Sequence, residues 1–238
     1  MTSLYYAVLA GLMDVLGGAL VVTPARRSRR FLSFLVGFGA GFMLAVALLE
    51  MLPDAITARG GITAVLIGYL LVHLTQHTLT PHFHFGEETH EHEMVSQGIG
   101  GWALVGLLPH ALFDGVAISS AFLSSAALGA LVFTAVALHK VPEGVSLASI
   151  MLASHNSARR AVAGVASIAV ATIVGALVTP RLELLVRYGL ALSAGVTIYV
   201  AASNLIPESQ RERGWLVPGG VFLGVLAFYA IKMALPAA

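Results

Sequence analysis

Long apolar stretches separated by short connections recur along the whole chain. A bilayer core is crossed by about 20 consecutive apolar residues in a helix, because backbone polar groups in lipid must bond within their own segment. Only 11% of the 238 residues are charged, whereas soluble domains carry about 25%. We therefore predict an all-α polytopic membrane protein that forms a single transmembrane domain over residues 1–238. The eight predicted spans are Leu4–Thr23, Phe31–Leu52, Ile62–Thr80, Ile99–Phe122, Ala126–Ala153, Ala161–Thr179, Leu184–Leu205 and Trp215–Leu235.

Arginines are divided unevenly between the two sets of predicted connections. The odd-numbered connections hold Arg26, Arg27, Arg29, Arg30, Arg159, Arg160, Arg211 and Arg213, and the other side holds Arg59, Arg181 and Arg187. Because connections rich in Lys and Arg stay in the cytoplasm, both termini are predicted to face outside. The longest connection, Pro81 to Gly98, then lies in the cytoplasm.

Two neighbouring predicted spans carry the same ionisable pattern. His110 and Asp114 are four residues apart in one span, and His139 and Glu143 repeat this spacing in the next. Residues four apart share a helix face, and ionisable groups inside a membrane are costly and usually functional. Two imidazoles and two carboxylates suit Zn²⁺ and also accept Fe²⁺ or Mn²⁺. The pattern predicts one intramembrane metal site, and the alternative is polar pairing that only holds helices together.

Further polar residues lie near the predicted site. Lys140 is adjacent to His139 and could pair with Glu50, Asp14 or Glu143, while Asp14 has no assigned role. The thioether of Met43 is a candidate additional ligand, and core packing is the competing interpretation.

Candidate pathway residues lie towards the ends of the spans. Glu50 and Asp54 would form an acidic outer mouth that attracts cations. His73 and His77 are four apart near the predicted cytoplasmic end of the third span. Histidine-rich tracts bind divalent metals, so the cytoplasmic loop is a candidate weak site. Its histidines are His82, His84, His90 and His92.

On these motifs the chain resembles the ZIP family of divalent metal transporters. The family pattern His-Asn-x-x-Glu/Asp-Gly reads here as residues 110–115, and His-x-x-Pro-Glu-Gly reads as residues 139–144. The resemblance implies eight helices in a 3+2+3 arrangement, a histidine-rich cytoplasmic loop and a frequent homodimer. It also implies an elevator-type carrier that moves metal towards the cytoplasm.

The chain also departs from the family pattern. Many members bind a second metal through the residue after each motif histidine, and these positions are Ala111 and Lys140 here. We therefore predict a single site, with the Lys140 ammonium in place of the second ion. In the seventh span, pathway positions where relatives often have His or Glu are Ser203 and Asn204.

These observations predict a transporter, not an enzyme, in a bacterial inner membrane. Zn²⁺ is the expected substrate, with Fe²⁺, Mn²⁺, Cd²⁺ and Co²⁺ as alternatives. The expected partners are these ions and the lipid bilayer, without nucleic acid. One rival is an intramembrane zinc-dependent hydrolase, although the His-Glu-x-x-His helix motif does not occur in the sequence. A channel or a non-transporting metal sensor with the same ligands is the other rival.

Overall fold

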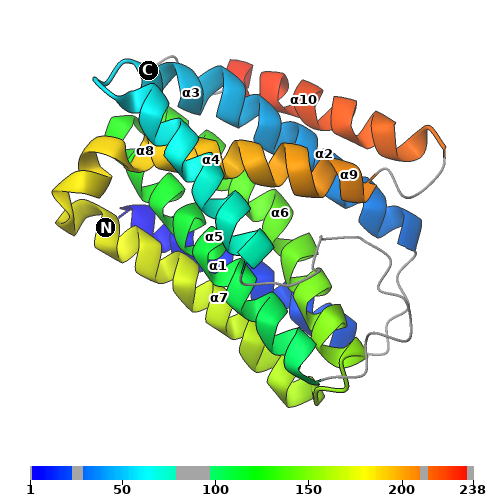
Figure 1. Cartoon of the computed structure of the whole chain (residues 1–238). Helices are drawn as coiled ribbons and strands as arrows, with labels where there is room; N and C mark the ends of the chain where they lie inside the picture. The colour runs from blue at the N-terminus through cyan, green and yellow to red at the C-terminus, as the bar shows by residue number, and fades with distance from the viewer. Residues whose placement is uncertain (1, 23–28, 79–96, 210–213, 235–238) are drawn as a thin grey trace.

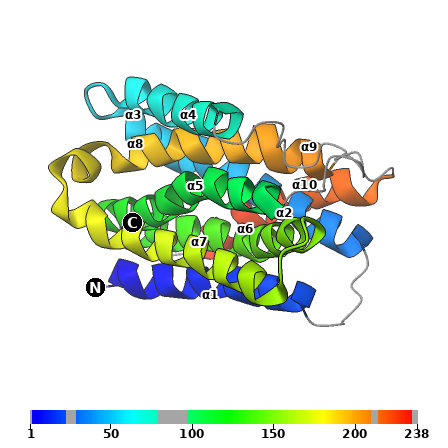
Figure 2. The ribbon, with the colours of Figure 1, turned by 60° about the horizontal axis from the view of Figure 1, so that its bottom comes forward.

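The computed structural model describes residues 2–22, 29–78, 97–209 and 214–234, and all of its regular elements within these ranges are helical. Figures 1 and 2 show the helices packed together in one bundle, with α4 crossing α8 at an angle in Figure 1. The elements are α1 (Thr2–Val22), α2 (Arg29–Val46), η1 (Ala47–Met51), α3 (Leu52–Ile56), α4 (Gly61–Thr78), α5 (Gln97–Ser124), α6 (Ala126–Ala153), α7 (Ala158–Val178), η2 (Thr179–Arg181), α8 (Glu183–Tyr199), η3 (Val200–Leu205), α9 (Ile206–Ser209) and α10 (Leu216–Ala234).

Six helical stretches among the described residues are long and apolar enough to cross a membrane. Two shorter apolar helices, Gly61–Gln76 and Pro218–Ala234, correspond to the third and eighth predicted spans. The prediction of an all-α polytopic membrane protein is therefore confirmed at this level. Exposed side chains such as Leu66, Leu74 and Phe222 fit this environment, because the surface of a membrane helix faces lipid.

Serine caps explain why two of the helices begin where they do. Ser125, the single residue between α5 and α6, accepts a hydrogen bond from the Leu128 amide at 3.1 Å. Ser157 accepts one from the Arg160 amide at the start of α7. These bonds satisfy amides that lack a helical partner. The short connection at Ser125 forces α5 and α6 to run antiparallel as direct neighbours.

The second and seventh predicted spans are each interrupted by a π-helical turn. In the second span this turn is η1, which contains Glu50, and in the seventh it is η3, which contains Asn204. A π turn inserts one residue into the helical ladder and often lies at a functional site. No pattern in the sequence predicted either turn.

The helices fall into two groups that pack mainly within themselves. We call α1, α5, α6 and α7 the site bundle, and α2, α4, α8 and α10 the frame helices. In the site bundle α1 packs on α6 and α7, and α5 packs on the same two helices. The frame helices form two tight pairs, α2 with α10 and α4 with α8. In Figure 1 the frame helices occupy the upper part of the molecule and the site bundle the lower part.

The two groups meet along a seam formed mainly by α5 against α8 and α2 against α6. One apolar cluster extends across this seam and includes Phe42, Ile118 and Val200. Polar contacts between the groups are few among the described residues. The Ser193 hydroxyl donates to the Phe113 carbonyl at 3.2 Å, and the Ser124 hydroxyl donates to an Asp54 oxygen at 2.6 Å.

Candidate metal centre

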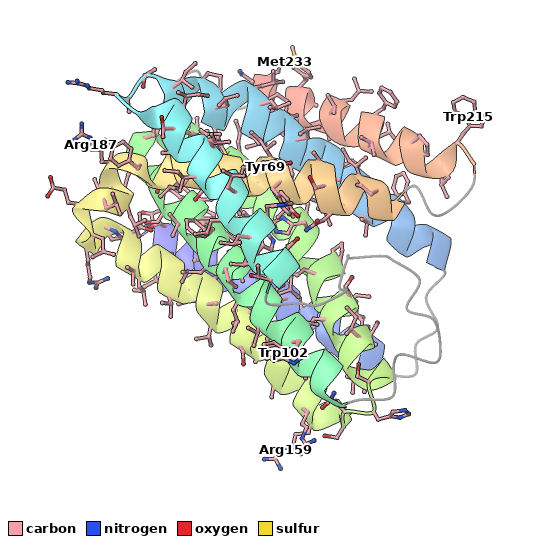
Figure 3. All side chains as sticks on the ribbon, in the orientation of Figure 1. Tyr69, Trp102, Arg159, Arg187, Trp215 and Met233 are labelled. Atoms are coloured by element: carbon pink, nitrogen blue, oxygen red, sulfur yellow. The ribbon has the colours of Figure 1, made fainter. Side chains whose placement is uncertain are left out.

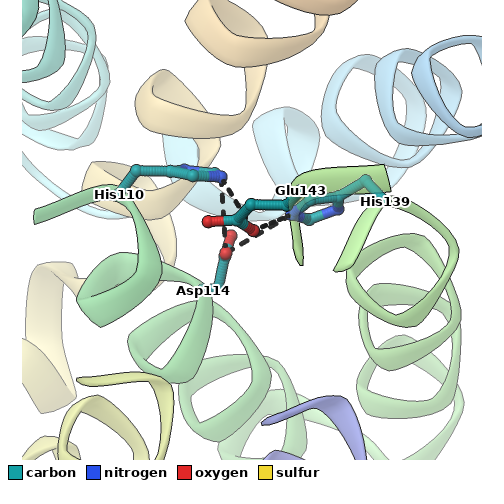
Figure 4. Close-up of side chains that lie close together, drawn as sticks. All are labelled: His110, Asp114, His139 and Glu143. Carbon is teal, nitrogen blue, oxygen red and sulfur yellow. Dashed lines mark hydrogen bonds and ion pairs between the residues drawn. The ribbon is translucent and has the colours of Figure 1, made fainter. Parts of the chain in front are cut away.

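The two predicted ligand pairs come together inside the site bundle. α5 presents His110 and Asp114 one helical turn apart, and α6 presents His139 and Glu143. One ligand atom from each of these residues lies within 4.8 Å of the other three. Figure 4 shows the four side chains converging from the two helices. Each residue is at most 6% exposed, so bulk water cannot satisfy these groups.

The separate distances show how compact the group is. Oδ2 of Asp114 lies 3.3 Å from Nε2 of His139 and 3.5 Å from Nε2 of His110. Oε2 of Glu143 lies 3.9 Å from the same two nitrogens. An ion between atoms at these separations needs only small movements to reach the usual zinc–ligand distances of about 2.0–2.2 Å.

The hydrogen bonding of His139 prepares its other nitrogen for a cation. Its Nδ1 lies 3.0 Å from the Ala135 carbonyl oxygen, which can only accept, so Nδ1 carries the proton. In the neutral ring the lone pair of Nε2 then faces Oδ2 of Asp114, which is also an acceptor. Two facing acceptors repel each other unless a positive charge lies between them. A backbone acceptor on the far nitrogen is a common way to orient a metal-binding histidine.

Lys140 lies at the centre of a second group of contacts beside these ligands. Its Nζ is 2.7 Å from Oε2 of Glu143, 2.8 Å from Oδ2 of Asp114 and 3.4 Å from Oδ2 of Asp14. The alternative pairing with Glu50 was wrong, because Glu50 forms an ion pair with Lys232 of α10. The contacts fit the prediction that Lys140 takes the space of a second ion, which stays a prediction. Ala111 is fully buried in the apolar core of the site bundle.

A small cavity adjoins the ligands at the seam. It is lined by His110, His139 and Glu143 from the site bundle and extends towards the last turns of α4 and η3. Its polar lining there includes Gln76 and Asn204, which are joined by a hydrogen bond of 3.0 Å from the Asn204 amide.

The cavity also involves two residues that the sequence analysis missed. Gln76 and Ser146 line it, and neither was a candidate. Ser146 lies three residues after Glu143, a spacing that returns to nearly the same helix face and could have indicated it. No comparable signal pointed to Gln76, which faces the cavity only because α4 packs on α8.

The remaining candidates from the sequence lie apart from the four ligands. Met43 is buried in the apolar cluster that crosses the seam and is not among the described residues that line the cavity. His73 is exposed and packs against the ring of Tyr199. Ser203 is 3.4 Å from the Tyr69 hydroxyl, within the frame helices. Figure 3 shows the position of Tyr69 on α4.

The remaining predicted residues are His77, the four loop histidines and the two acidic residues of the predicted outer mouth. His77 belongs to the last turn of α4. The loop histidines His82, His84, His90 and His92 lie outside the described residues, so their proposed role stays a prediction. The acidic outer mouth also stays a prediction, although both of its residues have partners: Glu50 pairs with Lys232, and Asp54 accepts from Ser124.

Sequence comparison agrees with this geometry. A model of the ZIP zinc transporter family matches residues 84–232, which is more than half of the chain and includes all four ligand candidates. The chain belongs to the ZIP family. Together with the six long apolar helices, this membership identifies an integral membrane protein.

The curated relatives are named as zinc transporters. The zinc transporter ZupT of Shigella dysenteriae serotype 1 (strain Sd197) is 38% identical over 87 residues. The ZupT proteins of Escherichia coli O1:K1 and of strain K12 are 37% identical over 87 residues. These matches cover 34% of this chain and 33% of each relative, so about a third of the relatives' length is matched. Lys140 and Asp14 are buried beside the four ligands but do not belong to the ligand pattern, so the pattern does not explain why they are there.

Proposed function

We propose that this chain transports divalent metal ions, with Zn²⁺ as the preferred substrate, across a bacterial inner membrane. The observation that carries the proposal is the convergence of four ligand atoms within 4.8 Å in the buried interior of membrane-crossing helices. Membership of the ZIP family and the similarity to ZupT zinc transporters support it. Two nitrogen and two oxygen donors suit zinc and leave Fe²⁺, Mn²⁺, Cd²⁺ and Co²⁺ as weaker candidates.

Transport requires that the ion be bound but able to leave. The cavity at the seam offers an exit from His110, His139 and Glu143 towards Gln76 and Asn204. The amide groups of these two residues bind a cation only through neutral oxygens, so they would pass an ion on without retaining it. On the predicted orientation this exit leads to the cytoplasm, where the histidine-rich loop would receive the ion.

The two-group architecture supports an elevator-type mechanism. All four ligands belong to the site bundle, so this bundle can move as one body with its ion, while the frame helices stay in place. The proposed topology has eight spans in a 3+2+3 arrangement, with both termini outside. The start of α1 and the end of α10 lie at the same end of the molecule in Figures 1 and 2, as an even number of crossings requires. A homodimer completes the proposal.

Metal uptake into proteoliposomes tests this function. Purified protein is reconstituted around a zinc-sensitive dye, and the initial rate is followed after Zn²⁺ is added outside. We expect His139→Ala/Glu143→Ala to reduce uptake to the level of empty liposomes, because half of the ligand set is lost. The matched control is His155→Asn/Glu183→Ala, which removes one imidazole and one carboxylate from exposed positions outside the site. Equal uptake by the ligand variant and the control would contradict the site assignment.

The same assay separates the rival functions. A carrier saturates with increasing Zn²⁺, whereas a channel continues to respond to the gradient. A hydrolase or a sensor would retain its zinc and show no flux. Competition by the four alternative metals ranks the substrates.

A further inference from the structure

Asp14 is a buried carboxylate that is not one of the four proposed ligands. It lies in the middle of α1, is 0% exposed, and its two carboxylate oxygens have no hydrogen-bond partner. A charged group inside a membrane helix costs several kcal/mol on some insertion scales and usually has a partner or a function. Its close charged neighbour is Lys140, whose Nζ lies 3.4 Å from Oδ2.

Lys140 holds the same oxygens that an incoming ion needs. Its two shortest contacts are with Oδ2 of Asp114 and Oε2 of Glu143. These are also the oxygens that face Nε2 of both histidines. A metal ion held by them would face the ammonium at close range and repel it. Lysine carries three donors on a flexible stem, so its ammonium can turn towards Asp14 without any helix moving.

Direct backbone contact fixes Asp14 at this distance from the site. A Cβ atom added to Gly144 would overlap the backbone carbonyl oxygen of Asp14, and one added to Gly17 would overlap that of Val141. Glycine thus lets α1 and α6 touch on both sides of the pair Asp14 and Lys140. The carboxylate cannot withdraw, because the backbone that carries it is pressed against the residue next to Glu143.

Counting the buried charges shows what this arrangement does. In their ionised forms, three carboxylates and one ammonium carry two net negative charges, which a divalent ion neutralises. Without the Asp14 carboxylate the occupied site would hold one uncompensated positive charge in a low-dielectric interior, where like charges are expensive.

We propose that Asp14 takes over Lys140 as its counter-ion when a divalent metal ion occupies Asp114 and Glu143, and that it thereby sets the affinity of the site. This inference rests on the proposed function, because it assumes that the four ligands bind the ion. Asp14 is a positioning residue and not a ligand. The ammonium exchanges partners as the ion enters and returns to the ligand oxygens as it leaves, which makes binding reversible.

A double-mutant cycle on Zn²⁺ binding tests the inference. The full chain is purified in detergent, and its Zn²⁺ dissociation constant is measured by competition with a chromophoric chelator. We expect Asp14→Asn to weaken binding by at least about tenfold, since one unit of charge is lost within a few ångströms of the ion. Adding Lys140→Gln should restore the dissociation constant to within about threefold of the original value, because the double variant again balances the ion's charge.

Three further measurements make the cycle decisive. Glu183→Gln removes an exposed carboxylate and should leave the dissociation constant unchanged. Elution as a single species on size exclusion and recovery of binding in the double variant show that Asp14→Asn is folded. The variant His139→Ala/Glu143→Ala should lose the tight Zn²⁺ binding and keep at most the weak binding predicted for the histidine-rich loop.

The outcomes are distinguishable. Zn²⁺ binding by His139→Ala/Glu143→Ala with the original affinity would overturn the proposed function and the inference with it. If that variant loses binding but Asp14→Asn binds as tightly as the original protein, the inference alone is wrong. It is also wrong if Lys140→Gln fails to bring the Asp14→Asn protein closer to the original affinity.

Discussion

The site bundle and the frame helices differ in what they bury. The buried Asp, Glu, His and Lys side chains among the described residues all belong to the site bundle, and they are Asp14, His110, Asp114, His139, Lys140 and Glu143. The frame helices bury apolar and aromatic side chains such as Phe42, Met43 and Phe228, and their pair Lys232 and Glu50 is partly exposed. One group is thus built around charges that an ion can balance, and the other around packing that no ion affects.

In the proposed mechanism, this difference lets the ion travel with one group only. Ligands shared between the two groups would have to break whenever the groups move, whereas ligands within one bundle keep their geometry. The seam between the groups has few polar contacts and a largely apolar interior. Such a surface can slide with little loss of specific bonding.

The largest expected effect is the loss of Zn²⁺ uptake when a disulfide cross-links α5 to α8 across the seam. The chain has no cysteine, so two introduced cysteines can form a disulfide only with each other within one molecule. A Cβ built on Gly189 of α8 lies 3.6 Å from Cβ of Ser120 of α5, within the range for a disulfide. We expect oxidised Ser120→Cys/Gly189→Cys to abolish Zn²⁺ uptake in proteoliposomes and reduction to restore it.

The control for this cross-link lies within the site bundle. A Cβ built on Gly11 of α1 is 3.2 Å from Cβ of Ala169 of α7, so these two helices must separate by a few tenths of an ångström to form a disulfide. Oxidised Gly11→Cys/Ala169→Cys should transport as well as its reduced form, because both positions belong to one body. Transport by the cross-linked seam variant would remove the reason for dividing the molecule into two moving groups.

The next largest expected effect is on stability, which should fall more when Lys140 is replaced than when Lys232 is replaced. Lys140→Met leaves three buried carboxylates without their cation, and breaking a buried ion pair in this way costs about 3–5 kcal/mol. Lys232→Met removes a half-exposed pair, which is worth below about 1 kcal/mol. Thermal unfolding in detergent with a chelator should show this gap, and added Zn²⁺ should narrow it. If both variants unfold at one temperature, the charges of the site bundle are not coupled as described.

Packing in the frame helices should affect stability but not affinity. Phe42 is 0% exposed and meets the ring of Phe228 edge-on, with centroids 6.2 Å apart. Phe42→Ala should reduce the free energy of unfolding by about 3 kcal/mol, because it leaves a cavity, and should leave the Zn²⁺ dissociation constant within about twofold. Phe222→Ala, at a position 72% exposed, is the matched control and should change neither quantity. A large loss of affinity in Phe42→Ala would show that the frame helices shape the site.

The smallest effect concerns a single bond across the seam. Ser193→Ala removes the hydroxyl that donates to the Phe113 carbonyl. We expect a loss of about 1 kcal/mol in the free energy of unfolding and unchanged Zn²⁺ affinity. Thr197→Val, on the same face of α8 one turn later, serves as the comparison, since no described bond crosses the seam from it. Equal stabilities of the two variants would mean that this bond contributes nothing.

Much of the fold and of the candidate site could be predicted from local pattern. The apolar stretches predicted the helices, because a lipid environment leaves a segment few alternatives to a helix. The four-residue spacing predicted which side chains share a face, since the helical period alone decides this. The π turns in the second and seventh spans were not predicted, because they depend on how α2 and α8 pack. Gln76 was missed for the same reason.

The sequence by itself determined the membrane-embedded helical architecture, the family and the two ligand pairs, all of which depend on hydrophobicity and on spacing within one helix. Only the tertiary structure decided which charges meet. Lys140 had three candidate partners in the sequence, and the close backbone contact at Gly17 and Gly144 selected Asp14 together with the ligand carboxylates and excluded Glu50. The physical reason is that an ion pair depends on distances of a few ångströms between helices, which the spacing of residues along one helix does not encode.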